Sequence, residues 1–183
     1  MATFVLIHGV AQSLAGYTAP LVCERVSVDL LALLNAMVPA PGEPAGAWWE
    51  NTGQPRAMLE HAAHEGRTAR DPAELMADPA YLFLHDLPRE IAAESIHHVR
   101  AQSGTPFRER WAQKRWPDVP TRFLLSRQDR LFPAGFQRRV VRDRLGIAPD
   151  EMDGGHLVAL SRPVELAERL DASAVQVSAG RSA

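Results

Sequence analysis

The sequence predicts an α/β fold: a mostly parallel sheet flanked by helices, with a helical cap inserted into it. Three observations indicate this fold. Short apolar runs of the kind buried in parallel sheets alternate with amphipathic helical patterns near both ends of the chain. The middle of the chain loses this alternation and becomes rich in proline, glycine and tryptophan. The 183 residues are 46% hydrophobic, enough for one core that buries about 70% of the unfolded surface.

The first part of the sheet domain is predicted within residues 1–38. Residues 3–10 are expected to form an apolar strand, and residues 14–26 a helix that Pro20 should kink. Residues 28–35 are a nearly unbroken apolar run, as expected for a strand that is covered on both faces. Strand, helix and strand in this order indicate a βαβ unit.

Residues 39–120 are expected to form the helical cap over the sheet. Asp71 and Pro72 have the N-cap and first-turn proline of a helix start, and Pro88 opens a further helix to about residue 99. All four tryptophans fall in this segment, where we expect them to pack rather than to bind substrate.

The alternation returns over residues 121–171, the second part of the sheet domain. Strands are predicted at 121–126 and near 147–152, with a helix from Pro133 to Gly146 between them and a last helix from Pro163 to about residue 170. Residues 172–183 are small and polar and are expected to form a disordered tail. One face of the middle helix should point its arginines to solvent, namely Arg138, Arg139, Arg142 and Arg144.

Charge and cysteine content exclude several classes of protein. Twenty basic and twenty-two acidic residues give a net charge of −2, which provides no electrostatic basis for binding nucleic acid or an anionic membrane. Cys23 is the only cysteine, so an internal disulfide is excluded and a reducing compartment is indicated. No apolar stretch approaches the length of a membrane-spanning helix. We therefore expect a cytoplasmic protein.

Three polar residues follow predicted parallel strands: Ser13, Asp129 and His156, in that order. Ser13 lies among small residues where an apolar strand turns into a helix, which is the pattern of a nucleophile elbow. Carboxyl ends of parallel strands share one edge of the sheet, so the three side chains should meet there. A serine becomes nucleophilic when an imidazole accepts its proton and a carboxylate orients that imidazole. The three residues therefore predict a catalytic triad.

These motifs resemble the α/β-hydrolase superfamily, in particular its small esterase and hydroxynitrile-lyase-like branch. The similar stretches are Phe4 to Gly9, Ala11 to Gly16, Leu125 to Pro133 and Asp153 to His156 followed by a final helix. The resemblance implies a serine hydrolase that cleaves small carboxylic esters through an acyl-enzyme on Ser13, Asp129 and His156. It also implies an oxyanion hole formed by the backbone N–H groups of Leu14 and Val10, and it implies no cofactor.

The chain departs from the family pattern between Gly9 and Ser13, which are only four residues apart. Family members place these two motifs on different strands, and a parallel crossover needs about a dozen residues. An internal deletion is therefore expected, with both motifs on one strand. That strand would lie at the edge of the sheet, next to the strands that follow it in the chain, and could support self-association.

Two alternatives to the hydrolase remain open at this stage. One is a lyase that uses the same triad on a cyanohydrin-like substrate, and the other is a truncated relative without catalytic activity. A metal site at His61 and His64 is not expected because no third ligand is evident. Cys23 is expected to be a buried small hydrophobe. The remaining histidines are expected in structural or surface positions: His8 in a turn, and His85, His97 and His98 at the surface or at helix ends.

Overall fold

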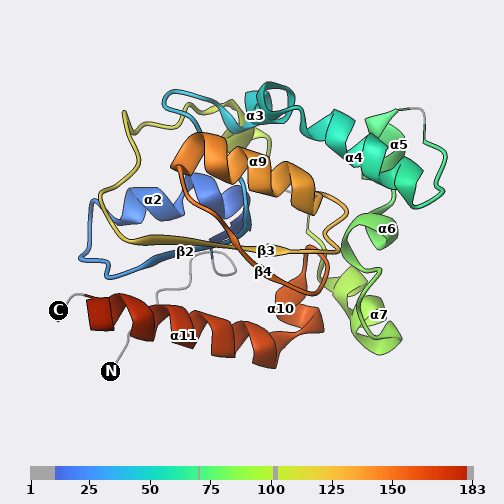
Figure 1. Ribbon diagram of the computed structural model, residues 1–183. Coiled ribbons are helices and arrows are strands. Elements are labelled where there is room, and N and C mark those ends of the chain that lie inside the picture. The colour runs from blue at the N-terminus through green and yellow to red at the C-terminus, as the bar shows by residue number, and fades with distance from the viewer. Residues whose placement is uncertain (1–10, 70, 101–102, 181–183) are drawn as a thin grey trace.

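The computed structural model describes residues 11–69, 71–100 and 103–180. The described strands form one parallel sheet whose spatial order, β1-β2-β3-β4, is also the order of the chain (Figure 1). The strand bounds are Gln12–Ser13 for β1, Leu31–Ala36 for β2, Thr121–Ser126 for β3 and Asp150–Met152 for β4. This is the predicted fold class, and β2, β3 and β4 are neighbours in the predicted order.

The strand predictions can be compared directly for three of the four strands. Strand β3 has the predicted bounds, and β2 and β4 lie within three residues of theirs. The predicted strand at residues 3–10 lies outside the described residues. The register pairs Leu31 with Thr121 and Leu124 with Asp150, so the carboxyl ends of β2, β3 and β4 reach the same edge of the sheet.

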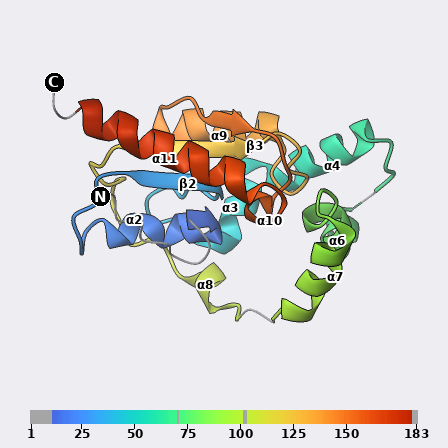
Figure 2. The same ribbon diagram turned by 90° about the horizontal axis from the view of Figure 1, so that it is seen from below.

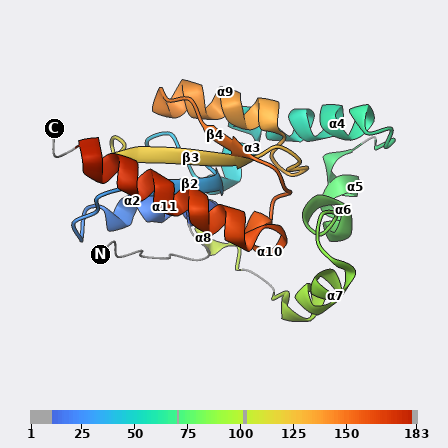
Figure 3. The ribbon, with the colours of Figure 1, turned by 60° about the horizontal axis from the view of Figure 1, so that its bottom comes forward.

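Helices cover both faces of the sheet, as Figures 1 and 3 show. On one face, side chains of β2 and β3 pack against η1, α2, α3 and α9. Trp48, Phe132 and Phe136 contact one another in this layer. On the other face, Leu34 and Leu124 form a smaller cluster with residues of α10 and α11. The helices of these two layers are η1 Leu14–Tyr17, α2 Ala19–Val22, α3 Ala45–Thr52, α9 Ala134–Leu145, α10 Val158–Ser161 and α11 Pro163–Gly180.

The predicted helix over residues 14–26 is divided at Thr18. A 3₁₀ turn, η1, precedes it and α2 follows it, with Pro20 in the first turn of α2. Proline lacks a backbone N–H and suits a first turn, so the expected kink takes the form of a restart. The helical structure ends at Val22, four residues before the predicted end.

The segment between β2 and β3 is helical, and its described residues contain no strand. Besides α3 it contains α4 Gln54–His64, α5 Pro72–Met76, α6 Pro79–Phe83, α7 Arg89–His98 and α8 Thr105–Arg108. Its first half shares the main core, because Trp48 and Met58 are fully buried there. In contrast α7 buries no residue and projects away from the sheet (Figure 2). The division into cap and sheet domain stays a prediction.

Two predictions about the C-terminal half are wrong. Helix α11 runs to Gly180, although a disordered tail was expected from residue 172. The small residues there include several alanines, which favour helix, and Ser173 and Ser178 donate to carbonyls one turn back. Arg144 does not face solvent either, since its guanidinium is held in an ion pair with Glu43.

Candidate active site

Ser13 ends β1 and immediately precedes η1, so it occupies the turn from strand to helix. Its backbone has φ 53° and ψ −124°, a conformation that side-chain-bearing residues rarely adopt. The Ser13 carbonyl accepts a hydrogen bond from the Met37 N–H at 2.9 Å, which fixes the turn to the end of β2. Strained backbone of this kind is concentrated at functional sites, and a strained strand-to-helix turn is the geometry of a nucleophile elbow.

Asp129 follows β3 in the next turn at this edge of the sheet, and its side chain is completely buried. One carboxylate oxygen, Oδ1, accepts from the backbone N–H groups of Leu131 and Phe132 at 2.9 and 2.8 Å. The other oxygen, Oδ2, lies 2.8 Å from Nδ1 of His156 and 3.4 Å from Nε2 of Gln137. The backbone donors fix the carboxylate so that Oδ2 faces the imidazole.

His156 follows β4 and two glycines, and only 2% of it is exposed. Because its Nδ1 faces a carboxylate, the imidazole donates from Nδ1 and leaves Nε2 as the basic nitrogen. Two aromatic rings meet the imidazole edge to face, Phe83 at 5.5 Å and Phe132 at 5.2 Å between centroids. The ring is thus held by one hydrogen bond and by packing on two sides.

Gln12, the residue before Ser13, donates from its side-chain amide to the His156 carbonyl. In the described part of the chain, no hydrogen bond joins the Ser13 hydroxyl to the imidazole. Catalytic hydrogen bonds are often long without a substrate and tighten when it binds. The structure therefore pairs Asp129 with His156 directly, and brings Ser13 to the same edge of the sheet.

Of the two predicted oxyanion-hole residues, Leu14 lies among the described residues. Leu14 directly follows Ser13 and opens η1, so its N–H belongs to the first turn of a helical segment. The N–H groups of such a turn have no partner within the helix and can bind an anion. Val10, the second predicted donor, and His8 lie outside the described residues.

A buried polar network beneath the site was not anticipated from the sequence. Asn35 is fully buried at the end of β2 with φ 42°, and its amide donates to Ser126 Oγ at 2.9 Å and to the His156 carbonyl at 3.2 Å. Its side-chain oxygen accepts from the Ser126 N–H at 2.7 Å. The signal in the sequence is a single asparagine at the end of an apolar run, which was assigned to the strand and given no role of its own.

His85 and Asp86 are also closer to the site than the sequence indicated. His85 was expected at the surface or at a helix end, but both residues are half-buried against the histidine loop, Asp153 to His156. The Asp86 carboxylate accepts from the Gly155 N–H at 2.6 Å, and His85 Nε2 lies 3.1 Å from the Gln128 carbonyl. Desolvation on burial and the charge of Arg130 lower the pKa of His85 from its ordinary value.

The remaining sequence-predicted residues lie away from this site. The described residues contain no group of three or more potential ligands that could hold a metal. His61 and His64 therefore belong to no such group. Cys23 is half-buried and packs against the main core, and burial raises the pKa of its thiol. None of the described helices is both long and apolar enough to span a membrane.

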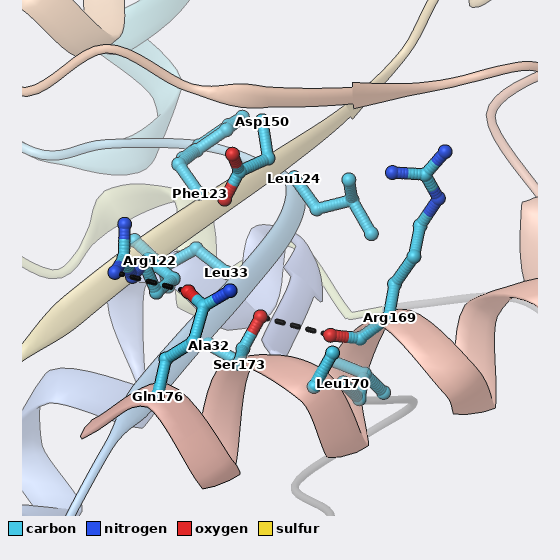
Figure 4. Close-up of a pocket in the computed structure, with 11 residues that line it drawn as sticks. Ala32, Leu33, Arg122, Phe123, Leu124, Asp150, Arg169, Leu170, Ser173 and Gln176 are labelled. Atoms are coloured by element: carbon cyan, nitrogen blue, oxygen red, sulfur yellow. Dashed lines mark hydrogen bonds between the residues drawn. The ribbon is translucent and has the colours of Figure 1, made fainter. Parts of the chain in front are cut away.

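A cavity of about 150 Å³ lies elsewhere, between the sheet and α11 (Figure 4). Its lining includes Arg122 and Gln176, which are hydrogen-bonded to each other, together with Asp150 and Arg169. None of the three predicted triad residues lines it. It is therefore separate from the site formed by Asp129 and His156.

Comparison with known proteins agrees with the fold. The model of a family described as "Alpha/beta hydrolase family" matches residues 2–169. No curated protein matches the sequence. Among solved structures, polyneuridine aldehyde esterase is similar with a TM-score of 0.67 and 18% identity over 88% of this chain and 69% of that one. A pyrethroid hydrolase from Sphingobium faniae is similar with a TM-score of 0.63 and 21% identity over 90% of this chain and 68% of that one. The chain thus spans about two thirds of the length of these enzymes, and it belongs to the α/β-hydrolase family.

Proposed function

We propose that the protein is a serine hydrolase that cleaves small carboxylic esters through an acyl-enzyme. The observation that carries this proposal is the buried Asp129–His156 pair, 2.8 Å apart, at the sheet edge where Ser13 occupies its strained turn. Membership of the α/β-hydrolase family supports hydrolysis, and the esterase and pyrethroid hydrolase among the similar structures support an ester as the substrate.

In the proposed reaction, Ser13 is the nucleophile, His156 is the base and then the acid, and Asp129 orients His156. His156 Nε2 accepts the proton of the Ser13 hydroxyl while Oγ bonds to the ester carbonyl carbon, which gives a tetrahedral oxyanion. The imidazolium then protonates the departing alkoxide, and the C–O bond of the ester breaks to leave acyl-Ser13 and an alcohol. Water repeats the same steps, with His156 as base and then acid, and releases the carboxylic acid. Asp129 holds the imidazole in orientation through Nδ1.

The oxyanion would be stabilised at the start of η1, where the Leu14 N–H follows the nucleophile. The second donor is proposed at Val10. Removing one donor from an oxyanion hole costs roughly 10²- to 10³-fold in turnover, so the intactness of the second donor sets how active this shortened chain is.

A fluorophosphonate probe tests the proposal, because it labels only a serine activated as a nucleophile. We expect one label per chain in the wild type and none in Ser13→Ala or His156→Ala. Ser95→Ala is a matched control, since Ser95 lies half-buried on α7 and, in the described part of the chain, donates to the Ile91 carbonyl of its own helix. A folded wild-type protein that takes no label would contradict the proposal and favour the inactive relative.

Substrate assays then separate hydrolysis from lyase chemistry. We expect release of p-nitrophenol from acetyl and butyryl esters, lost in the Ser13→Ala variant. Cleavage of an aromatic cyanohydrin to aldehyde and cyanide without ester turnover would instead support the lyase.

A further inference from the structure

The histidine loop is held from outside the sheet domain by the segment that joins α6 to α7. Asp86 from this segment accepts a hydrogen bond from the N–H of Gly155, the residue directly before His156, at 2.6 Å. In the same segment, His85 Nε2 lies 3.1 Å from the Gln128 carbonyl, and Phe83, the last residue of α6, packs against the imidazole. Three successive contacts therefore connect the helical segment with the loops that carry His156 and Asp129.

Gly155 is the residue that allows this approach. A Cβ atom at this position would lie 2.6 Å from Asp86 Oδ1 and 2.9 Å from His85 Cε1, distances that real Cβ atoms essentially never show. Only glycine permits the Asp86 carboxylate to reach the backbone so closely. The close packing and the short hydrogen bond thus depend on the same pair of residues.

The other side of the loop is held by the sheet domain. Gln12 and Asn35 both donate to the His156 carbonyl, and Asp129 holds the ring at Nδ1. The backbone of His156, the proposed general base, is thus bonded on both sides. Asp86 holds the Gly155 N–H before it, and Gln12 and Asn35 hold the His156 carbonyl after it. On the N-terminal side, Gln128 bonds the Gly154 carbonyl and N–H, so loss of the Asp86 contact would release the Gly155 N–H while these other restraints remain.

We propose that Asp86 is a positioning residue for His156, through which the helical segment sets the orientation of the imidazole. This inference rests on the proposed function for its kinetic part. The bond of a carboxylate to a backbone N–H is charge-assisted and stronger than a neutral one, so it can fix a loop that contains two glycines.

One feature of Asp86 makes the conservative variant informative. Its second oxygen, Oδ1, is buried and has no hydrogen-bond partner among the described residues. Asparagine can keep its oxygen on the Gly155 N–H and place its NH₂ group where Oδ1 now lies. Asp86→Asn should therefore retain the contact, whereas Asp86→Ala removes it.

The experiment compares Asp86→Ala, Asp86→Asn and Gly155→Ala with the wild type. Glu94→Ala is the matched control, because Glu94 is an exposed carboxylate on α7 that pairs with the exposed His98 one turn away. We expect Asp86→Ala and Gly155→Ala to lower kcat by about 10- to 100-fold, the effect of a misplaced catalytic group. KM should stay within about twofold of the wild type, and Asp86→Asn and Glu94→Ala should keep the wild-type kcat within about threefold.

A second readout does not require turnover. The proton between His156 Nδ1 and Asp129 should give a low-field proton NMR signal, which we expect to be sharp in the wild type and Asp86→Asn, and broadened or shifted in Asp86→Ala. An inactive wild type would contradict the proposed function and leave this signal as the test of Asp86. An unchanged signal and kcat in Asp86→Ala would overturn the positioning role, as would an Asp86→Asn variant that loses both as fully as the alanine variant.

Discussion

Glu43 and Arg144 form a two-pronged ion pair between residues 101 positions apart in the chain. The side chains are 5% and 16% exposed, and the carboxylate also accepts from Asn51 and from the Ala40 N–H. Burial alone would raise the pKa of Glu43, but these hydrogen bonds outweigh it and lower the pKa below its ordinary value. The pair fixes the loop before α3 to the last turn of α9.

We therefore predict that Arg144→Met destabilises the protein by about 3–5 kcal/mol, because it leaves a buried carboxylate without its cation. Urea unfolding monitored by tryptophan fluorescence measures this change. Since the Glu43 pKa is lower in the folded state, its contribution is present above the ordinary glutamate value of 4.5 and is lost as the pH falls below it. The difference between wild type and variant should shrink in that range. Arg56→Met, which breaks an ion pair in solvent, is the control and should have no measurable effect.

The turn after Ser13 should not accept a larger residue at Gly16. A Cβ atom there would lie 1.8 Å from the Met37 carbonyl oxygen, and this carbonyl belongs to backbone that cannot move aside. Gly16→Ala should cost about 1–3 kcal/mol or more, or prevent folding. Gly135→Ala is the comparison, because nothing lies within 4 Å of its Cβ position in α9. It should be neutral or stabilising, by up to about 1 kcal/mol, and equal melting temperatures for the two variants would refute the clash.

Asp129→Asn should separate folding from catalysis. The amide oxygen can still accept from the Leu131 or Phe132 N–H, but an NH₂ group facing the imidazole would favour the wrong tautomer of His156. We expect a loss of roughly 10⁴-fold in kcat with a near-native circular dichroism spectrum. Retention of a tenth or more of the activity would show that His156 does not need this carboxylate.

His85 should make the free energy of unfolding depend on pH near and below 6.5, a higher range than that of Glu43. Its pKa is lowered by burial and by Arg130, against the opposing charges of Asp86 and Glu65. The unfolded state thus binds a proton more readily, so stability is present above the ordinary value of 6.5 and falls as the pH drops below it. Between pH 7.5 and 5 the wild type should lose more stability than His85→Gln. Parallel curves from chemical denaturation would contradict this assignment.

Self-association through the edge of the sheet is a further prediction. Among the described strands, β1 and β4 lie at the two edges of the sheet. Strand β1 pairs with β2 through only Gln12 and Ser13, whereas β2 has six residues. Unpaired N–H and C=O groups at a sheet edge can pair with a second chain. Light scattering coupled to gel filtration should show a mass that rises with concentration above the 20.1 kDa of one chain. A constant monomer mass up to high concentration would contradict the prediction.

The sequence predicted those parts of the molecule that depend on local pattern. The apolar run after Pro120 gave β3 its correct bounds, and Pro133 and Gly146 marked the ends of α9. The pairing of Asp129 with His156 followed from their places after successive parallel strands, because such positions converge at one sheet edge. These inferences require only chain order and the period of the hydrophobic pattern.

What the sequence did not predict depends on contacts between distant segments. Asn35 lies in an apolar run, and its role arises only when Ser126 and the His156 carbonyl are brought to it by the sheet. Asp86 is 69 positions from Gly155, and nothing in the local pattern distinguishes it from a solvent-exposed aspartate. Arg144 was assigned to the polar face of its helix because the buried partner, Glu43, is not visible in helical periodicity.

The agreement between strand order and chain order has a consequence for folding. Each strand pairs with the next strand along the chain, so the sheet can add its strands in the order in which they are synthesised. The site cannot grow in this way, because the bond from Gln12 to the His156 carbonyl joins positions 144 residues apart. The turn at Ser13 and the loop at His156 can therefore meet only when nearly the whole chain has been made, and a chain that ended before β4 would lack this contact.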